Sequence, residues 1–341
     1  EQRHDNSDII FKGKDDGTTI TALTLDMSEA GKAIFNGAIT GTSFNGIPFY
    51  FNANSTYTSN VSATENSASA NTAYGFGAMD AITSGDSNTA IGVNALGLLN
   101  GGSDNVAIGH AAGDALTTGN FNVAIGRSAL STEDGQGGNV AIGYQALTLQ
   151  NTSANAYNVA VGHQAGASIS TGVENTLVGG LAGDALNTGA RNTALGYAAL
   201  SSETTHGYNV AVGWRALLVQ NAGAHAYNVA VGYDAGVSVS TGTLNTLVGG
   251  LAGDALTTGT KNAVFGYNAL STEDTGNGTT AIGYQTLLNQ NYDGYSHNTA
   301  VGYNAGLNVT TGVQNTIIGS VAGDALTTGS RNVVLGYGAL S

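Results

Sequence analysis

Hydrophobic and polar positions recur along this chain with a fixed short period. From residue 71 onward, units begin at a 17-residue spacing, which widens to 19 after positions 139, 209 and 279. Four units make a 70-residue block, and the same phrase returns in the next block, as NVAIGYQAL at 139–147 and NVAVGWRAL at 209–217 show. Sixteen units follow one another in this way, and an array of short repeats is typical of a solenoid.

Each unit opens with the same pattern. The first position is Asn in 15 of 16 units, with Thr279 as the exception, and the fifth position is Gly in all of them. The second to fourth positions are uncharged and rich in Thr, Val, Ala and Ile, which favours a short β-strand that ends in a turn. The recurrent Gly and the poor helix formers around it argue against a helix.

These columns predict an all-β fold, a flattened parallel β-solenoid whose 17-residue and 19-residue coils each hold two short strands and two connections. Each coil would pair with the next about 4.8 Å away. Stacked asparagines would form an amide ladder, and stacked glycines would supply positive φ or close approach. The expected ladder residues are Asn88, Asn105, Asn122, Asn139, Asn158 and Asn175, with the glycines Gly92, Gly109, Gly126 and Gly143.

The uncharged strand positions also predict a partner. Alternate side chains of a strand point to opposite faces, and here both faces are uncharged, as in strands that are buried on both sides. One face would pack inside the coil. The other face, expected to be mostly Ala, would need cover, most economically from another copy of the chain. The pattern therefore predicts homo-oligomerisation without fixing the number of subunits.

Residues 1–70 lack the repeat. Residues 1–40 are expected to form a β-rich stalk or connector, and residues 41–70, rich in Ser, Asn, Thr and Ala, a transition to the solenoid at 71–341. Three strands are expected in the connector, at Ile9–Lys12, Thr19–Asp26 and Lys32–Ile39.

The composition excludes several classes of function. The chain has 341 residues with 52 Gly, one Pro and no Cys, and its net charge is −14. Nine basic residues spread over the whole length make no patch for nucleic acid. No run of about 20 apolar residues is available to cross a membrane. We therefore expect neither nucleic-acid binding nor membrane insertion. The first residue, Glu1, and an end inside a repeat suggest a fragment or a processed product.

Acidic and histidine residues are the candidates for chemistry. Asp114 and Glu133 recur at 70-residue intervals, so successive copies would lie about 19 Å apart, whereas glycosidase carboxylates lie about 5–10 Å apart. We interpret these acids, including Glu203 and Glu273, as solvated residues of turns. His110 and His163 share a column but lie too far apart to share a metal within one chain, and a threefold axis would bring three copies of one His together only if that column faced the axis. No hydrolase, phosphate-loop or dinucleotide motif appears, so the sequence predicts no catalytic residue, metal or cofactor.

Two features are more typical of contact surfaces. The sixth column carries aromatic residues that either bind sugars or protein partners, or pack at a corner or between subunits. The 19-residue units lengthen loops at 150–157, 220–227 and 290–297, which should protrude from one edge and which vary on a constant scaffold. The residues expected to contact a receptor are Tyr157, Trp214, His225, Tyr227, Tyr292 and Tyr295.

The segment NVAIG, as at 105–109, is followed in other units by GYQAL (143–147) or GYNAL (266–270). This phrase resembles the head repeat of trimeric autotransporter adhesins of the YadA-like type, and similar repeats of phage tail-fibre proteins. The resemblance covers residues 71–341 and implies a left-handed β-roll, three copies of which pack around a threefold axis. Residues 7–40 are similar to a segment of phage fibre and other virion appendage proteins.

The resemblance implies a homotrimeric fibre of a phage virion, with a multivalent host-recognition surface. Its partners would be a host cell-surface glycan or protein and other virion proteins, and this segment could also be a spacer. A bacterial cell-surface adhesin is the alternative, and a polysaccharide depolymerase is a third. The coils are longer than many in adhesin heads, and the neck, coiled-coil stalk and membrane anchor of autotransporters are not found in this chain, which favours the virion.

Overall fold

The computed structural model describes residues 9–15, 18–26, 32–34, 50–52, 55–57 and 67–341. The chain divides into two units, residues 1–49 and 50–341. In the first unit, β1 (Ile9–Asp15) pairs antiparallel with β2 (Thr18–Asp26), which pairs antiparallel with β3 (Lys32–Ile34). The strands expected here are present, although β1 is longer than expected. Residues 35–39 and most of the 41–70 transition lie outside the described residues.

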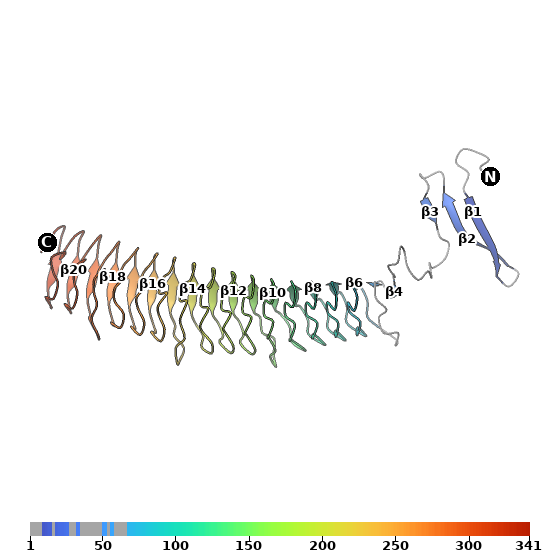
Figure 1. Ribbon diagram of the computed structural model, residues 1–341, viewed down its shortest axis with the longest axis horizontal. Coiled ribbons are helices and arrows are strands. Elements are labelled where there is room, and N and C mark those ends of the chain that lie inside the picture. Colours follow the sequence, from blue (N-terminus) through green and yellow to red (C-terminus); the bar gives the residue numbers. More distant parts are fainter. Residues whose placement is uncertain (1–8, 16–17, 27–31, 35–49, 53–54, 58–66) are drawn as a thin grey trace. The chain divides into compact units, whose positions relative to one another are not determined.

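The second unit is one ladder of short strands (Figure 1). β4 (Tyr50–Asn52) pairs antiparallel with β5 (Ser55–Tyr57), and β5 starts a parallel ladder that continues strand by strand to β21. The repeat supplies sixteen three-residue strands: β6 (Thr72–Tyr74), β7 (Thr89–Ile91), β8 (Val106–Ile108), β9 (Val123–Ile125), β10 (Val140–Ile142), β11 (Val159–Val161), β12 (Thr176–Val178), β13 (Thr193–Leu195), β14 (Val210–Val212), β15 (Val229–Val231), β16 (Thr246–Val248), β17 (Ala263–Phe265), β18 (Thr280–Ile282), β19 (Thr299–Val301), β20 (Thr316–Ile318) and β21 (Val333–Leu335). The predicted parallel β-solenoid is confirmed.

The expectation of two strands in each coil is wrong, because each described coil from residue 71 onward has one. The seventh, ninth and last residues of every complete coil have positive φ, as Arg215 (55°), Leu217 (51°) and Tyr227 (50°) do. Such residues turn the chain too sharply for a second extended segment. The coils still pair through these turns, since the N–H of Arg215 donates to the carbonyl of Tyr197 at 2.9 Å and that of Leu217 to Ala235 at 3.1 Å.

The invariant glycine of the fifth column is required by the stacking of the coils. Its φ lies between 116° and 145° in all sixteen coils, a region that other residues rarely adopt. At Gly179, where φ is 137°, a Cβ would also lie 2.6 Å from the carbonyl carbon of Gly196 in the next coil. Glycine is therefore needed at this column for both its conformation and its lack of a side chain.

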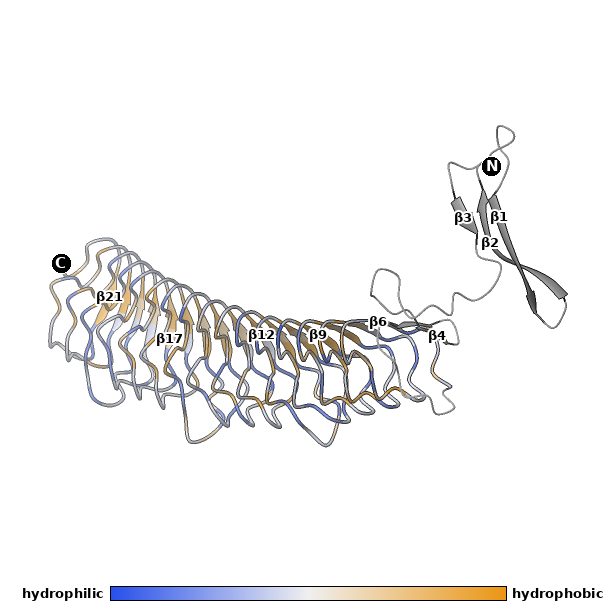
Figure 2. Ribbon diagram, turned by 45° about the vertical axis from the view of Figure 1, so that its right-hand side comes forward, coloured by the Kyte–Doolittle hydropathy of each residue, from blue (hydrophilic) through white to orange (hydrophobic). Residues whose placement is uncertain are grey.

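The core lies inside the coils and is lined by small residues. Ala141 in the third column and Ala146 in the eighth are fully buried, whereas the strand positions on either side of Ala141 are partly exposed. The expectation that alanines cover the outer face is therefore wrong. They point inward, since a short coil has little interior volume, and the outer face carries Val, Thr, Ile and Leu. Figure 2 shows these apolar strands as one band along the solenoid.

The ninth and twelfth columns share the remaining core volume. From residue 105 to 331, a coil with Gly in the ninth column has Leu, Ile or Val in the twelfth, as Gly183 and Leu186 do. A Cβ on Gly183 would lie 2.8 Å from Leu186 Cδ1, so both positions cannot be large. A coil with Leu in the ninth column has Glu or Gln in the twelfth, as Leu200 and Glu203 do. This alternation places polar side chains inside the solenoid at two of every four coils.

We predict that Gly179→Ala destabilises the solenoid by about 3 kcal/mol or more, because the change forces both backbone strain and a clash with Gly196. Chemical denaturation followed by circular dichroism measures this. The control is Gly180→Ala in the next residue. Gly180 has no positive φ, and its Cβ would meet only the Tyr197 ring at 3.5 Å. The control should change the free energy of unfolding by less than about 0.5 kcal/mol. Equal effects would contradict the stacking argument.

Candidate functional site

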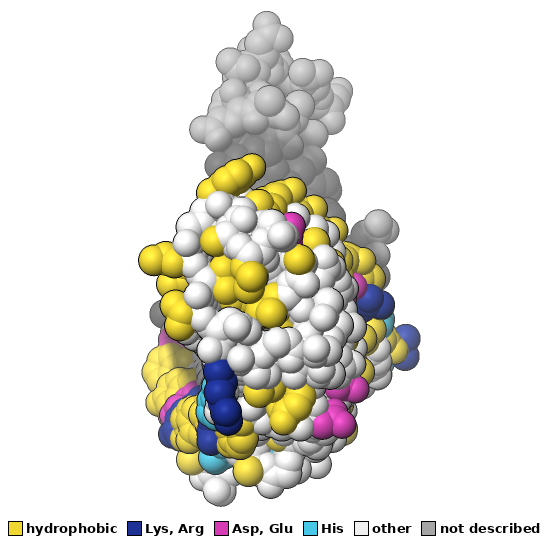
Figure 3. All heavy atoms as spheres, turned by 90° about the vertical axis from the view of Figure 1, so that its left-hand side faces the viewer, with side chains coloured by type: hydrophobic (Ala, Val, Ile, Leu, Met, Phe, Trp, Pro, Cys, Tyr) yellow, Lys and Arg dark blue, Asp and Glu magenta, His cyan; other side chains and the backbone are white. Residues whose placement is uncertain are grey.

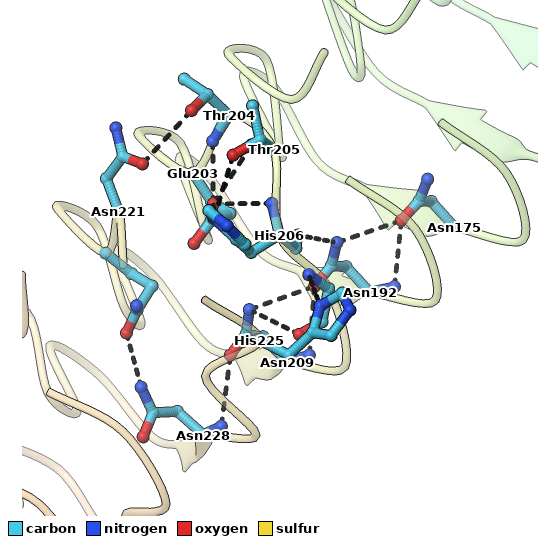
Figure 4. Close-up of polar contacts among 12 residues, drawn as sticks. Asn175, Asn192, Glu203, Thr204, Thr205, His206, Asn209, Asn221, His225 and Asn228 are labelled. Atoms are coloured by element: carbon cyan, nitrogen blue, oxygen red, sulfur yellow. Dashed lines mark hydrogen bonds and ion pairs between the residues drawn. The ribbon is translucent and has the colours of Figure 1, made fainter. Parts of the chain in front are cut away.

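A buried ladder of asparagines runs along the starts of the strands (Figure 4). The N–H and Nδ2 of Asn192 donate to Oδ1 of Asn175 at 3.0 and 3.3 Å, and Asn209 bonds to Asn192 in the same way. The expected ladder residues are all buried and joined by the same bond from a backbone N–H to Oδ1: Asn88, Asn105, Asn122, Asn139, Asn158 and Asn175. Burial leaves this column no ligand-binding surface, so it holds the coils in register.

Three glutamates of the twelfth column satisfy backbone donors from inside the turns. Glu133, Glu203 and Glu273 have no exposed surface. Oε1 of Glu203 accepts the N–H of Thr204 and that of His206, both at 3.1 Å (Figure 4). The interpretation of these residues as solvated turn acids is wrong. A turn that folds over the core directs its N–H groups inward, where only a side chain can accept them.

Burial changes the acidity of two of these glutamates. It raises the pKa of Glu133 to about 7, and the hydrogen bond from the Gln136 N–H opposes the shift only in part. The second carboxyl oxygen of Glu133 is buried without a hydrogen-bond partner. Burial also raises the pKa of Glu273, although its Oε2 accepts a hydrogen bond from Gln290 at 2.9 Å. Ionisation of these groups therefore opposes folding.

Each of the three long loops has a buried glutamine at its base. Oε1 of Gln150 accepts Nδ2 of the ladder residue Asn158 at 2.7 Å, and Gln290 does the same with Asn298 at 2.8 Å. Gln220 and Asn228 form the equivalent pair at 2.5 Å. Each loop is thus closed at its base by a side chain tied into the Asn ladder. Figure 1 shows the lengthened coils standing out at the edge away from the strands, as expected.

The end of the middle loop contributes a cluster of rings. Nδ1 of His225 accepts the N–H of Gly207 at 3.2 Å, and its ring meets the ring of Tyr208 edge-on at 4.8 Å. Tyr227 stacks on Tyr208 at 5.1 Å, and Nη1 of Arg191 donates to the Tyr208 hydroxyl at 2.7 Å. Two of the expected contact residues, His225 and Tyr227, therefore belong to one cluster that spans neighbouring coils.

The other two loops place their rings in related positions. Tyr157 is exposed over 59% of its surface. Tyr295 stacks on His297 at 5.3 Å, and Nζ of Lys261 lies 3.4 Å from its hydroxyl. Tyr292 differs, because it is half-buried and its N–H bonds to the carboxylate of Glu273. The structure thus offers Tyr157 and Tyr295 to solvent more fully than Tyr292.

In the column that precedes each Asn, sequence reasoning named only the loop residues Tyr157 and Tyr227 and missed the members from the 17-residue coils. Arg191, Tyr208 and Lys261 belong to this column and contact the loop rings or pair with one another. Every residue in this column has positive φ. The spacing of the repeat could have indicated these residues, because it places Tyr208 and Tyr227 at the same position of successive coils. The residue type in this column varies from coil to coil, so the column does not stand out in the sequence.

Trp214, the remaining expected contact residue, belongs to the sixth column and not to the loops. Its ring stacks between Tyr197 and Tyr233, at 6.2 and 5.2 Å. The guanidinium of Arg215 lies 4.2 Å from the Trp214 ring and makes two hydrogen bonds, of 2.9 and 2.7 Å, to the carboxylate of Asp234. Figure 3, seen along the solenoid, shows Lys, Arg and His side chains gathered at separate places on its outline.

The described residues offer contact surfaces, and they include no group of three or more His, Asp or Glu that could hold a metal. Among the same residues there is no helix that is long and apolar enough to cross a bilayer. Comparison of the chain with protein-family models, curated protein sequences and solved structures finds no match.

The buried carboxyls predict an unusual dependence of stability on pH. Between the unfolded pKa of 4.5 and the folded pKa of about 7, folded Glu133 binds more protons than the unfolded chain, so the free energy of unfolding falls as pH rises. The difference between these pKa values corresponds to about 3 kcal/mol. Glu133→Gln should remove this fall in the free energy of unfolding. It should therefore raise the thermal midpoint of unfolding at pH 8, measured by circular dichroism.

Glu174→Gln is the control for that experiment, because Glu174 is an exposed residue paired with Arg191 at 2.7 Å. It should leave the slope between pH 4.5 and 7 unchanged. The double variant Glu133→Gln/Glu273→Gln should flatten the slope further than Glu133→Gln alone. Parallel curves for the wild type and the double variant would show that these carboxyls do not titrate as described.

Proposed function

We propose that this protein is a homotrimeric fibre of a phage virion that displays a multivalent surface for host recognition. The observation that carries the proposal is the apolar outer face of the strand ladder. Ile108, Leu195 and Ile282 in the fourth column expose 37%, 46% and 39% of their surface. The second column adds Val or Thr beside them in 15 of the 16 coils, and Ala263 in the other. A face of this kind, repeated along the ladder, is unusual for a monomer.

A second copy of the chain is the partner that fits this face. The same column recurs at each coil, so two copies placed side by side would match along their whole length. Closed cyclic symmetry would bury the face of every copy. Three copies is the number implied by the resemblance to YadA-like head repeats. The similarity of residues 7–40 to virion appendage segments supports the virion over the alternative of a bacterial surface adhesin.

The loops supply the recognition surface in this proposal. They vary in sequence between the three 70-residue blocks, while the Gln–Asn pairs that anchor them are the same. Loops on a rigid scaffold commonly carry binding residues. Three loops in each of three chains would bind a cell surface through many weak contacts. The receptor would be a glycan or a protein of the host surface.

The recurring acids give the depolymerase alternative no support. Glu133, Glu203 and Glu273 are buried in turns, and their copies are four coils apart, about 19 Å. A glycosidase needs two carboxyl groups about 5–10 Å apart at an open site. We therefore propose that the protein binds and does not cleave.

The assembly is tested by the mass in solution. Light scattering should give three times the chain mass of 34.0 kDa. Replacing Ile142 and Val212 by Lys on the outer strand face should lower the mass to that of one chain without loss of β-sheet signal. Thr152→Lys in a loop is the control and should leave the mass unchanged. A wild-type protein that is monomeric at micromolar concentration would refute the assembly.

The loops are tested by attachment to a panel of intact bacterial strains. The combined change of Tyr157, Tyr227 and Tyr295 to Ala should lower attachment at least tenfold, because it removes an exposed tyrosine ring from each of the three loops. The matched control changes the same residues to Phe, which keeps the rings and their stacking. Unchanged attachment of the Ala variant would favour a spacer function for this segment.

A further inference from the structure

The aromatic row of the sixth column is interrupted at regular intervals. Tyr197, Trp214 and Tyr233 stack on successive coils, and Tyr267, Tyr284 and Tyr303 do so one block later, at 5.7 and 5.2 Å. Between and beside these stacks, from residue 139 onward, the column holds one residue without a ring in each 70-residue block: Gly180, Gly250 and Ser320. The row therefore has three gaps there, each the width of one coil.

The backbone does not require glycine at these gaps. Gly180 and Gly250 lack a positive φ, unlike the invariant glycines directly before them. A Cβ on Gly250 would lie 3.4 Å from Tyr267 Cδ2, and one on Gly180 would lie 3.5 Å from Tyr197 Cδ2, which are ordinary contacts. A ring could stand here as it does on neighbouring coils. The missing side chain is thus a property of the surface and not of the fold.

Each gap lies between two aromatic side chains, one on the coil before it and one on the coil after it. Two coil spacings separate the flanking rings, about 10 Å. The rings that border the second gap, Tyr233 and Tyr267, expose 55% and 49% of their surface, against 40% for Trp214 and 42% for Tyr284 inside the stacks. Gly250 at the gap and the half-buried Leu251 next to it carry no charge. A ring-shaped, uncharged group with two apolar faces would match two aromatic rings at this spacing.

We infer that the gaps at Gly180, Gly250 and Ser320 are subsites for neutral hexopyranose units, and this inference rests on the proposed role in host-surface recognition. The C–H groups on both faces of a pyranose carry partial positive charge and match the negative faces of the two rings. Its hydroxyl groups point outward, toward water and the tyrosine hydroxyls. Successive subsites lie about 19 Å apart, so one linear polysaccharide can occupy several of them and bind by avidity.

The rings also need a fixed orientation to act as walls. Stacking on the next coil holds Tyr233 against Trp214 with only 4° between their planes, and Tyr303 against Tyr284 with 7°. The Arg215–Asp234 pair fixes the middle of one stack from the side, since Arg215 lies over Trp214. The walls are therefore ordered before a sugar arrives, which lowers the entropy cost of binding.

The inference is tested by filling the gaps with aromatic side chains. The variant Gly180→Tyr/Gly250→Tyr/Ser320→Tyr continues the aromatic row and closes all three gaps, and the Cβ atoms added at the two glycines make only ordinary contacts. The probes are mannohexaose, cellohexaose and maltohexaose by calorimetry, and soluble mannan by affinity electrophoresis. At least one hexaose should bind the wild type with millimolar or tighter affinity, and the filled variant should lose at least tenfold in affinity. The control is Thr188→Tyr, which adds a ring at an exposed residue of a 17-residue coil, outside both the sixth column and the long loops.

Three outcomes would overturn the inference. The first is that none of the probes binds the wild type at 10 mM. The second is equal binding by the filled variant and the wild type. The third is a change in the mass of the protein in solution when the gaps are filled, which would show that the gaps contact another copy of the chain. The trimer and the subsites can be refuted separately. A wild-type protein that is monomeric, but whose sugar binding depends on the gaps, would refute the trimer and not the subsites.

Discussion

The close stacking of one coil on the next is the constraint on which the rest of this structure depends. At the fifth column the backbones of neighbouring coils approach so closely that no Cβ fits, and the residue must have positive φ. The buried Asn ladder then fixes the register, because the N–H of each ladder residue bonds to the side chain of the one before. A slip by one residue would break both sets of contacts along the whole ladder.

Much of this fold follows from the sequence because the coils repeat the same local solution. The Asn and Gly columns specify the ladder and the turn, and their spacing specifies the 17-residue and 19-residue coils. The direction in which Ala141 points could not be predicted from the pattern. Uncharged residues on both sides of a strand leave its inner and outer faces undecided, and the volume inside the coil decides in favour of Ala.

The buried glutamates show a second limit of sequence reasoning. Glu133 lies in a polar segment that is typical of a solvated turn, yet the turn folds over the core and its N–H groups point inward. The paired alternation of Leu200 with Glu203 and of Gly183 with Leu186 was the available signal. It relates two columns three positions apart, and only the structure shows that they fill the same space. Of the expected contact residues, His225 and Tyr227 meet, whereas Trp214 lies in a separate row.

A scaffold of this kind separates the residues that build it from those that can vary. The first, third, fifth and eighth columns determine register and core, which leaves the outer strand face, the sixth column, the last column and the long loops free to vary. Adding or removing one ring in the sixth column changes the surface without touching a core contact, as the neighbouring positions Gly179 and Gly180 illustrate. The 70-residue period places residues of the same kind at equal intervals along the solenoid, as Gly180 and Gly250 show. Under the proposed function, weak contacts repeated at even intervals would add up to strong binding, which is the physical advantage of repeating one phrase.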